Sequence, residues 1–207
     1  MNLTPDYGET LLPYEELDAL LPTARSLLNE PITKAAVYDL EQGIEVEVKE
    51  TYLTAVLEGD LVLDELMDAH FVRKLHGELY GEIWSWAGQY RRAEANIGIA
   101  PERIAVELHD SLGTFLYRWQ ATEAWTPRQL GIAVHAETVR IHPFTDGNGR
   151  TTRLLADLVF LAAQGPEKSD LYDWEVDRAR YIQLLRQYDA HRNPDELAAF
   201  VGIQTLE

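Results

Sequence analysis

Residues 142–153, HPFTDGNGRTTR, place several chemically active side chains within one short stretch. His142 has an ordinary pKa near ~6.5, so its imidazole can take a proton from a hydroxyl group at neutral pH. Asp146 supplies a carboxylate, a hard oxygen ligand that Mg²⁺ accepts when it also binds phosphates. Arg150 and Arg153 are three residues apart, so they leave the same face of a helix. The stretch has the parts needed for phosphoryl or nucleotidyl transfer.

The glycine turn inside this stretch, Gly147-Asn148-Gly149, directly precedes a predicted helix. Such a turn can point backbone N–H groups into one concavity, where the helix dipole adds a positive potential. Each residue also has a structural explanation, because Asn148 or Asp146 can cap the helix and the arginines can face water. Capping alone requires neither two arginines on one face nor a flanking histidine, so the combination favours a site.

Two predicted helices position this stretch. The first covers residues 127–141 and ends before Pro143, because a residue that precedes proline disfavours the helical region. The second covers residues 150–164 and is apolar nearly all round, which predicts a helix that runs through the core. Gly165 and the proline after it end this second helix.

The remaining pattern predicts a mainly α fold. Apolar residues recur every fourth position from Leu63 to Ile83 and predict one long amphipathic helix. The glycines and the proline of residues 86–103 predict a loop with a small β-hairpin flap near residues 88–100. Further helices are expected over residues 14–21, 104–119, 176–190 and 194–205. Residues 32–59 conflict, since they combine a strand-like alternation with helical spacing.

Composition limits the class of protein. The chain has 207 residues, a size that suits one domain, and a formal net charge of −17. This charge argues against a general nucleic-acid-binding or anionic-membrane surface, because both ligands would be repelled. The absence of cysteine excludes disulfides and cysteine-ligated zinc, and favours a cytoplasmic compartment. No apolar run approaches the ~20 residues that span a bilayer, and we expect no signal peptide.

HPFTDGNGRTTR resembles the signature of the Fic (Fido) family, His-Pro-Phe-x-(Asp/Glu)-Gly-Asn-Gly-Arg-x-x-Arg, at every fixed position. Residues 75–91, LHGELYGEIWSWAGQYR, are similar to the family's helix that ends in Trp-Ala-Gly-x-Tyr/Phe-Arg. Residues 178–185, RARYIQLL, resemble a later helix beside the nucleotide site. The resemblance implies a Fic-type helical bundle over residues 60–207, preceded by an N-terminal arm over residues 1–59.

Fic proteins transfer the AMP moiety of ATP to a hydroxyl side chain of a target protein. The resemblance therefore implies ATP and Mg²⁺ as cofactors, and a target protein with an exposed Ser, Thr or Tyr as partner. Phe144 would anchor the loop in the core. The other implied roles are a general base at His142, a Mg²⁺ ligand at Asp146, an anion hole at Gly147, Asn148 and Gly149, and phosphate contacts at Arg150 and Arg153.

Two neighbouring features extend the implied site. Asn96, Ile97 and Gly98 fall where the family has a flap that aligns the target segment, although a plain surface hairpin explains them equally well. Tyr181 falls where the family places residues beside the adenine, while its helical spacing also suits a core aromatic residue.

Some Fic proteins are inhibited by a helix that carries (Ser/Thr)-x-x-x-Glu-(Gly/Asn), whose glutamate pairs with the second signature arginine. TAVLEG, residues 54–59, matches this text and makes Glu58 a candidate. SLLNEP, residues 26–31, offers Glu30 but has proline where glycine or asparagine belongs. A solvated helix face is the alternative explanation for both glutamates.

Other functions stay open at this point. The signature is also compatible with transfer of UMP, GMP or phosphocholine, with removal of AMP, and with a low-turnover nucleotide-responsive binding module controlled by a partner. The arm and the ANIGIA segment are loosely similar to a Fic subgroup called mobile mystery protein B, which implies a toxin paired with a small antitoxin or a helix-turn-helix companion. The sequence leaves the oligomeric state open.

Overall fold

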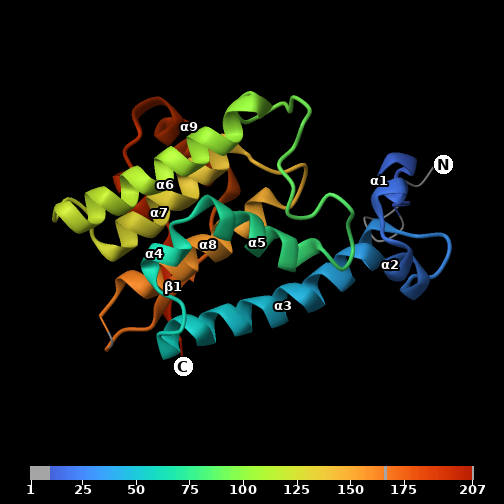
Figure 1. Cartoon of the computed structure of the whole chain (residues 1–207), viewed down its shortest axis with the longest axis horizontal. Coiled ribbons are helices and arrows are strands. Elements are labelled where there is room, and N and C mark those ends of the chain that lie inside the picture. Colours follow the sequence, from blue (N-terminus) through green and yellow to red (C-terminus); the bar gives the residue numbers. More distant parts are fainter. Residues whose placement is uncertain (1–9, 166, 207) are drawn as a thin grey trace.

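Helices α7 (Pro127–Ile141) and α8 (Asn148–Ala163) pack against each other at the centre of the fold (Figure 1). The computed structural model describes residues 10–165 and 167–206. Every residue from Leu130 to Thr138 in α7 is buried, as is every residue from Leu154 to Leu161 in α8. The prediction of a core helix after the signature is confirmed. α7 is buried all round as well, which its sequence did not indicate.

Local signals explain where α7 begins and ends. Thr126 caps its first turn, with its side chain accepting from the Gln129 N–H, and Pro127 occupies the first helical position. The helix ends at His142, which adopts a left-handed conformation with φ 53° and ψ 63°. The His142 N–H still donates to the Thr138 carbonyl at 3.0 Å, so the turn after the helix is closed tightly. The signature loop thus starts from a rigid end.

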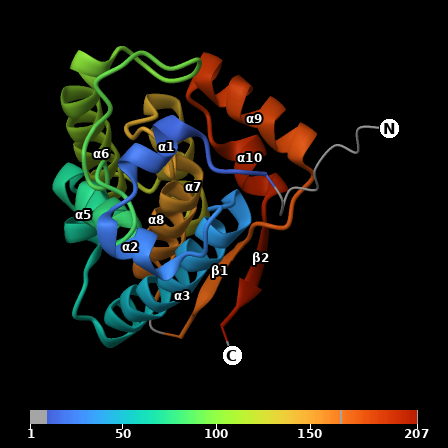
Figure 2. The ribbon, with the colours of Figure 1, turned by 90° about the vertical axis from the view of Figure 1, so that its right-hand side faces the viewer.

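Other helices surround this pair, and their order follows the prediction with changed boundaries. α5 packs on α8, whereas α6, α9 and α10 pack on α7. Figure 2 shows α9 and α10 together at one edge of the molecule. Their bounds are α4 (Leu63–Leu66), α5 (Ala69–Tyr80), a 3₁₀ turn (Pro101–Arg103), α6 (Ile104–Ala121), α9 (Arg178–His191) and α10 (Asp195–Phe200).

The single long helix predicted from Leu63 to Ile83 is wrong, because the chain breaks after α4. Met67 leaves the helical conformation, and Asp68 caps α5 by accepting from the His70 N–H. The apolar spacing continues through the break, since both pieces contact α8. The apolar spacing from Leu63 to Ile83 therefore indicated that α4 and α5 bury the same face, and did not indicate one unbroken helix.

The N-terminal part forms α1 (Tyr14–Ala19), α2 (Pro22–Leu27) and α3 (Lys34–Glu58). The conflicting patterns of residues 32–59 belong to one helix, α3. Thr33 caps its start, and Gly59 ends it in a left-handed conformation with φ 79°. It packs on α5 and α8, and Val46 of the apparent strand alternation is exposed on its outer face. Leu12 and Ile32 share the main core, so the described part of the predicted arm packs onto the bundle.

Residues 1–9 of the predicted arm lie outside the described residues, and the domain boundary at residue 59 stays a prediction. Within residues 10–165 and 167–206, no helix is long and apolar enough to cross a membrane.

The small sheet lies elsewhere than predicted. β1 (Asp170–Asp173) pairs antiparallel with β2 (Gly202–Thr205), with Asp170 opposite Thr205. Residues 88–100 contain no strand, so the predicted hairpin flap is wrong. The flap segment is irregular because side chains, rather than a ladder of backbone hydrogen bonds, hold it. The helix predicted over residues 194–205 also stops early, since its second half becomes β2.

Candidate active site

The signature loop between α7 and α8 holds His142 in a conformation that non-glycine residues rarely adopt. A left-handed histidine persists only where its surroundings hold it. Here its N–H donates to Thr138, and its carbonyl accepts from Arg91 Nε at 2.7 Å. Arg91 is buried, and its own N–H donates to the Pro143 carbonyl at 2.9 Å. The imidazole is therefore presented by a backbone that is fixed on both sides.

Asn148 closes the loop on itself. Its side-chain oxygen accepts from the Phe144 N–H at 2.9 Å, and its amide nitrogen donates to the Phe144 carbonyl at 2.8 Å. Phe144 is fully buried, as expected for an anchor. The Asn148 side chain is thus a clamp within the loop. The first backbone N–H groups of α8 have no acceptor inside the helix, so they are the groups that can bind an anion here.

His76 of α5 supports the signature loop from outside, a role that the sequence did not predict. Its ring is fully buried and stacks on Phe144, with ring centroids 3.7 Å apart. The Gly88 N–H donates to His76 Nδ1 at 2.9 Å, so the proton lies on Nε2, which donates to the Asp146 carbonyl at 3.1 Å. Burial lowers the pKa of His76 to about 4, so the ring is neutral at pH 7. Only the likeness of residues 75–91 to a family helix hinted at this role.

Most of the predicted nucleotide-site residues line one cavity of about 550 Å³. It lies between the signature loop, the flap and α9. Its size suits a nucleoside. The lining residues are Ile97, Val139, His142, Asn148, Gly149, Arg153, Trp174, Val176, Arg178, Tyr181, Ile182 and Leu185.

A second cavity, of about 340 Å³, is lined by residues of α3 and of the signature stretch. Arg153 lines both cavities, whereas Asp146 and Arg150 line only the second. Apolar side chains dominate the wall of the first cavity, and charged groups gather in the second. The first cavity therefore has the size and the apolar wall that suit a base, the second has the charged groups that suit phosphates, and Arg153 lines both.

The electrostatics of His142 suit a proton acceptor. Burial lowers the pKa of its imidazole, and the positive charge of Arg91 lowers it further. Asp146 acts in the opposite direction but does not outweigh these effects. The imidazole is therefore neutral at pH 7, the form that can accept a proton from a hydroxyl group.

Arg150 is already paired with a carboxylate, which the sequence did not predict. Its Nη1 lies 2.6 Å from Glu41 Oε2 of α3 and 4.0 Å from Glu45 Oε2. Glu41 is buried, and its other oxygen accepts from the Trp84 Nε1–H at 2.6 Å. The guanidinium at the phosphate end is thus held toward α3. No sequence pattern signalled Glu41, because the contact depends on how α3 lies against α8.

The two glutamates proposed as inhibitory do not reach Arg153. Glu30 is exposed and pairs with Arg25 at 3.1 Å. Glu58 is exposed as the last residue of α3, whereas the first half of that helix meets Arg150 through Glu41. In the described part of the chain, no carboxylate forms an ion pair with Arg153. The predicted inhibitory pairing is absent because the matching motif sits at the wrong end of α3.

The flap lies against His142 although it forms no strand. Gly98 has φ 100°, and a Cβ atom there would lie 2.6 Å from His142 Cβ and 2.7 Å from Arg91 Nη2. The Ile99 N–H donates to the Ile141 carbonyl at 3.3 Å. Ile97 lines the first cavity, while Asn96 is exposed. Of the three predicted flap residues, Gly98 packs against His142, Ile97 lines the same cavity as His142, and Asn96 faces solvent.

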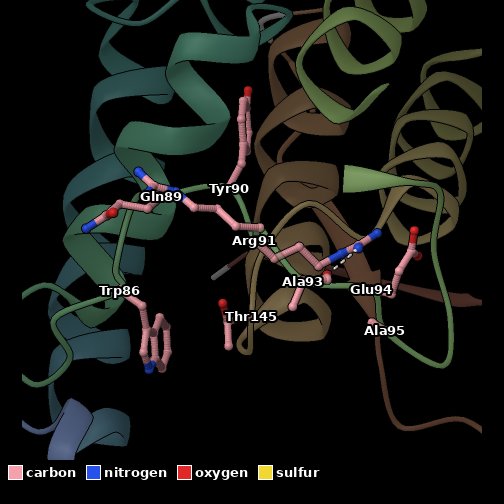
Figure 3. Close-up of a pocket in the computed structure, with 9 residues that line it drawn as sticks. Trp86, Gln89, Tyr90, Arg91, Ala93, Glu94, Ala95 and Thr145 are labelled. Carbon is pink, nitrogen blue, oxygen red and sulfur yellow. Dashed lines mark hydrogen bonds between the residues drawn. The ribbon is translucent and has the colours of Figure 1, made fainter. Parts of the chain in front are cut away.

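Arg91 also shapes a third cavity, of about 440 Å³, that opens on the flap near Thr145 (Figure 3). Its Nη1 donates to the Ala93 carbonyl at 3.0 Å, and Nη2 donates to the Ile99 carbonyl. One buried guanidinium thus connects the flap and the signature loop. Residues 75–91, which end in Arg91, resemble a family helix. The hydrogen bond from Arg91 to the His142 carbonyl, however, follows only from the fold.

Fold and site together define a helical domain with a nucleotide-sized cavity and a histidine beside a helix N-terminus. Residues 66–160 match the model of the Fic/DOC family. This part of the chain is therefore similar to the Fic/DOC family.

The protein is similar to named relatives over part of its length. It is 34% identical over 87 residues to "Protein adenylyltransferase fic-1" of Caenorhabditis briggsae, covering 39% of this chain and 16% of that protein. It is 27% identical over 150 residues to "Protein adenylyltransferase Fic" of Nematostella vectensis, covering 70% of this chain and 33% of that protein. The chain therefore spans at most a third of these two relatives.

Solved structures show the same fold. The N-terminal Fic domain of a cell filamentation protein from Bartonella quintana superposes with a TM-score of 0.62 at 16% identity, covering 84% of this chain and 86% of that chain. The BepC protein of Bartonella tribocorum, solved with bound AMPPNP, superposes with a TM-score of 0.59 at 15% identity, covering 89% and 100%.

Proposed function

We propose that this protein is an adenylyltransferase that transfers AMP from ATP to a hydroxyl group of a target protein. The observation that carries the proposal is that Arg153 lines two neighbouring cavities, with the neutral His142 and the start of α8 lining the first, and Asp146 and Arg150 lining the second. The names of the similar relatives and the AMPPNP bound to a protein of the same fold support ATP as the donor.

The proposed reaction follows from this arrangement. The target hydroxyl oxygen attacks the α-phosphorus while its proton passes to the imidazole of His142. The new oxygen–phosphorus bond replaces the bond to the β-phosphate oxygen, and pyrophosphate leaves. The N–H groups at the start of α8 and the guanidinium of Arg153 stabilise the charge on the phosphate oxygens. Fixing His142 from both sides supplies the orientation that such a step requires.

Asp146 fits the part of a Mg²⁺ ligand in this proposal. Among residues 10–165 and 167–206, no cluster of three or more metal-binding side chains could hold an ion by itself. Mg²⁺ commonly takes one or two carboxylates and completes its shell with phosphates and water. Asp146 is exposed and lines the same cavity as both signature arginines. When bound, the Mg²⁺ ion would neutralise part of the negative charge of the phosphates.

Labelling with ATP tests the proposal. We expect label carried on the α-phosphate to become attached to protein, and label carried on the γ-phosphate to be released with pyrophosphate. The His142→Ala variant should lose at least about a hundredfold in labelling rate, because a general base contributes about 10²–10⁴-fold. His109 is exposed on α6, so His109→Ala is the matched control and should label as the unchanged protein does.

The same assay separates the other functions. Retention of γ-label would replace nucleotidyl transfer by phosphoryl transfer, and preferred labelling by UTP or GTP would change the donor. ATP binding without transfer to any protein, including itself, would favour the nucleotide-responsive binding module. A cytoplasmic compartment, an antitoxin and a helix-turn-helix companion stay predictions from the sequence.

A further inference from the structure

We infer that His135 and Asp157 are positioning residues: they fix the ring of Tyr181, which the family resemblance already implies beside the base, and the ring of Trp174, which we add to the base wall, before the nucleotide binds. The inference rests on the proposed function, since it concerns the base-sized end of the same site. Trp174, His135 and Asp157 carry no signal in the sequence that would assign them to a site.

Tyr181 is turned inward by a hydrogen bond at its tip. Its hydroxyl lies 2.5 Å from Nε2 of His135, which is fully buried on α7. Burial also lowers the pKa of His135 to about 3, so the ring is neutral and can share a proton with the hydroxyl at pH 7. Because the hydroxyl points to a buried partner, Tyr181 lines the cavity with its ring rather than with its hydroxyl group.

Trp174 is held in the same manner from α8. Its Nε1–H donates to both carboxylate oxygens of Asp157, each at 3.2 Å. Asp157 is buried and also accepts from the Tyr172 N–H at 3.1 Å. The carboxylate therefore fixes both the indole ring and the strand that leads to it. A buried carboxylate with this set of donors costs stability unless its partners are in place.

His135 connects the two rings. Its imidazole lies 4.8 Å from the Trp174 ring and 5.9 Å from the Tyr181 ring, measured between centroids. The three aromatic groups thus form one packed unit behind the cavity. Rings that are already fixed lose little conformational freedom when a ligand stacks on them, which favours binding.

Apart from the exposed Arg178 at the start of α9, the rest of this wall is aliphatic. Val139, Val176, Ile182 and Leu185 line the same end of the cavity. With both aromatic polar atoms engaged from behind, this wall reads a base by the area of its ring rather than by the hydrogen bonds of its edge. Stacking on aromatic side chains changes affinity by about 5- to 150-fold per base. Purine nucleoside triphosphates should therefore bind more tightly than pyrimidine ones.

Binding of ATP and of inorganic triphosphate to the full chain, measured by calorimetry with Mg²⁺, separates the two ends of the site. Tyr181→Phe and Trp174→Phe remove the inward hydrogen bonds and keep an aromatic ring. We expect each to weaken ATP binding by about three- to tenfold and to leave triphosphate binding unchanged, because stacking affects the base alone. Asp157→Ala should match Trp174→Phe, and Asp157→Asn, which keeps an acceptor, should recover most of the affinity.

Tyr188 provides the matched control. It lies on the same helix as Tyr181, and its hydroxyl donates to a buried partner, Glu137, at 3.1 Å. It does not line the cavity, so Tyr188→Phe should lower the melting temperature without changing either dissociation constant. A merely structural role for Tyr181 would make the two phenylalanine variants behave alike.

The outcomes distinguish this inference from the proposed function. If Arg153→Ala weakens both ligands while the base-wall variants bind ATP normally, the inference is overturned and the proposed function stands. UTP binding as tight as ATP binding would also overturn it. If the unchanged protein binds neither ATP nor triphosphate, both proposals fail. Selective loss of ATP affinity in Tyr181→Phe and Trp174→Phe supports it.

Discussion

At the scale of single residues, the site depends on a histidine whose backbone is held in an unfavourable conformation. His142 is left-handed, and Gly98 of the flap packs directly against its Cβ atom. The chemical identity of His142 was evident from the signature, since the residue types and their spacing are local. Its conformation was not, because it depends on Arg91 and on the flap, which lie about fifty residues earlier in the chain.

The first prediction concerns the close approach of Gly98. Gly98→Ala should slow labelling by tenfold or more, because the new Cβ would overlap His142 and the φ of 100° is strained for alanine. We expect stability to fall by about 1–3 kcal/mol. Gly43→Ala is the control, since nothing lies within 4 Å of its added Cβ on α3. It should leave labelling unchanged; equal effects of both substitutions would contradict the prediction.

The second prediction is a pH profile for labelling. Because burial and Arg91 lower the pKa of His142, the neutral base persists to more acidic pH than for an ordinary histidine. The rate should therefore rise with pH, reach half its maximum below pH ~6.5, and be flat by pH 7. The measurement is the initial labelling rate between pH 5 and 8 at ATP concentrations well below saturation, where the profile reports the ligand-free protein. A midpoint above the ordinary value would show that the buried environment does not act in this way.

At the scale of elements, α3 supplies a carboxylate to the cavity that we propose for the phosphates. One residue of this helix, Glu41, neutralises Arg150 from the side, and the Trp84 indole fixes its carboxylate. Helical periodicity predicted the presence of helices in this bundle, but the facing of α3 toward α8 follows from packing. The inhibitory text at residues 54–59 therefore did not identify the carboxylate that meets a signature arginine.

The third prediction tests this contact. Glu41→Gln removes the negative charge but keeps an oxygen for Trp84, so Arg150 regains its full attraction for phosphate. We expect inorganic triphosphate to bind about three- to tenfold more tightly, while the melting temperature falls because a buried ion pair is broken. Glu45→Gln is the control, since this carboxylate is 4.0 Å away and more exposed. Unchanged or weaker binding in Glu41→Gln would contradict the expectation.

At the scale of the whole molecule, buried titratable groups connect the core to the site. His76 supports the signature loop, and His135 and Asp157 support the proposed base wall. Burial lowers the pKa of His76 to about 4 and of His135 to about 3, and raises that of Asp157 to about 6. These groups lie in the core formed by α5, α7 and α8, so the stability of the whole bundle depends on their charge states.

The fourth prediction is that stability falls as pH falls below about 6.5. Both histidines stay neutral in the folded state but take up protons when unfolded, so acid favours unfolding by about 2 kcal/mol for each at pH 5. Asp157 acts oppositely, because its raised pKa makes the folded form bind a proton between pH ~4 and 6. Two histidines outweigh one carboxyl group, so the net change is a loss.

Urea unfolding at pH 7.5 and pH 5 measures this difference. His76→Gln should reduce the pH dependence, whereas the exposed His109→Gln should not. A free energy of unfolding that is equal or higher at pH 5 in the unchanged protein would show that the buried histidines do not control acid stability.

The sequence by itself determined the signature, the histidine that we propose as the general base, and the helical class of this protein, because residue types, capping and short periodicities are local properties. It also predicted α7 and α8 nearly to their ends, where proline, glycine and buried spacing agree. Only the tertiary structure decided which distant groups meet: Glu41 with Arg150, His76 with the loop, and His135 and Asp157 with the base wall. These contacts join different elements, and their geometry follows from how the helices pack rather than from any one segment.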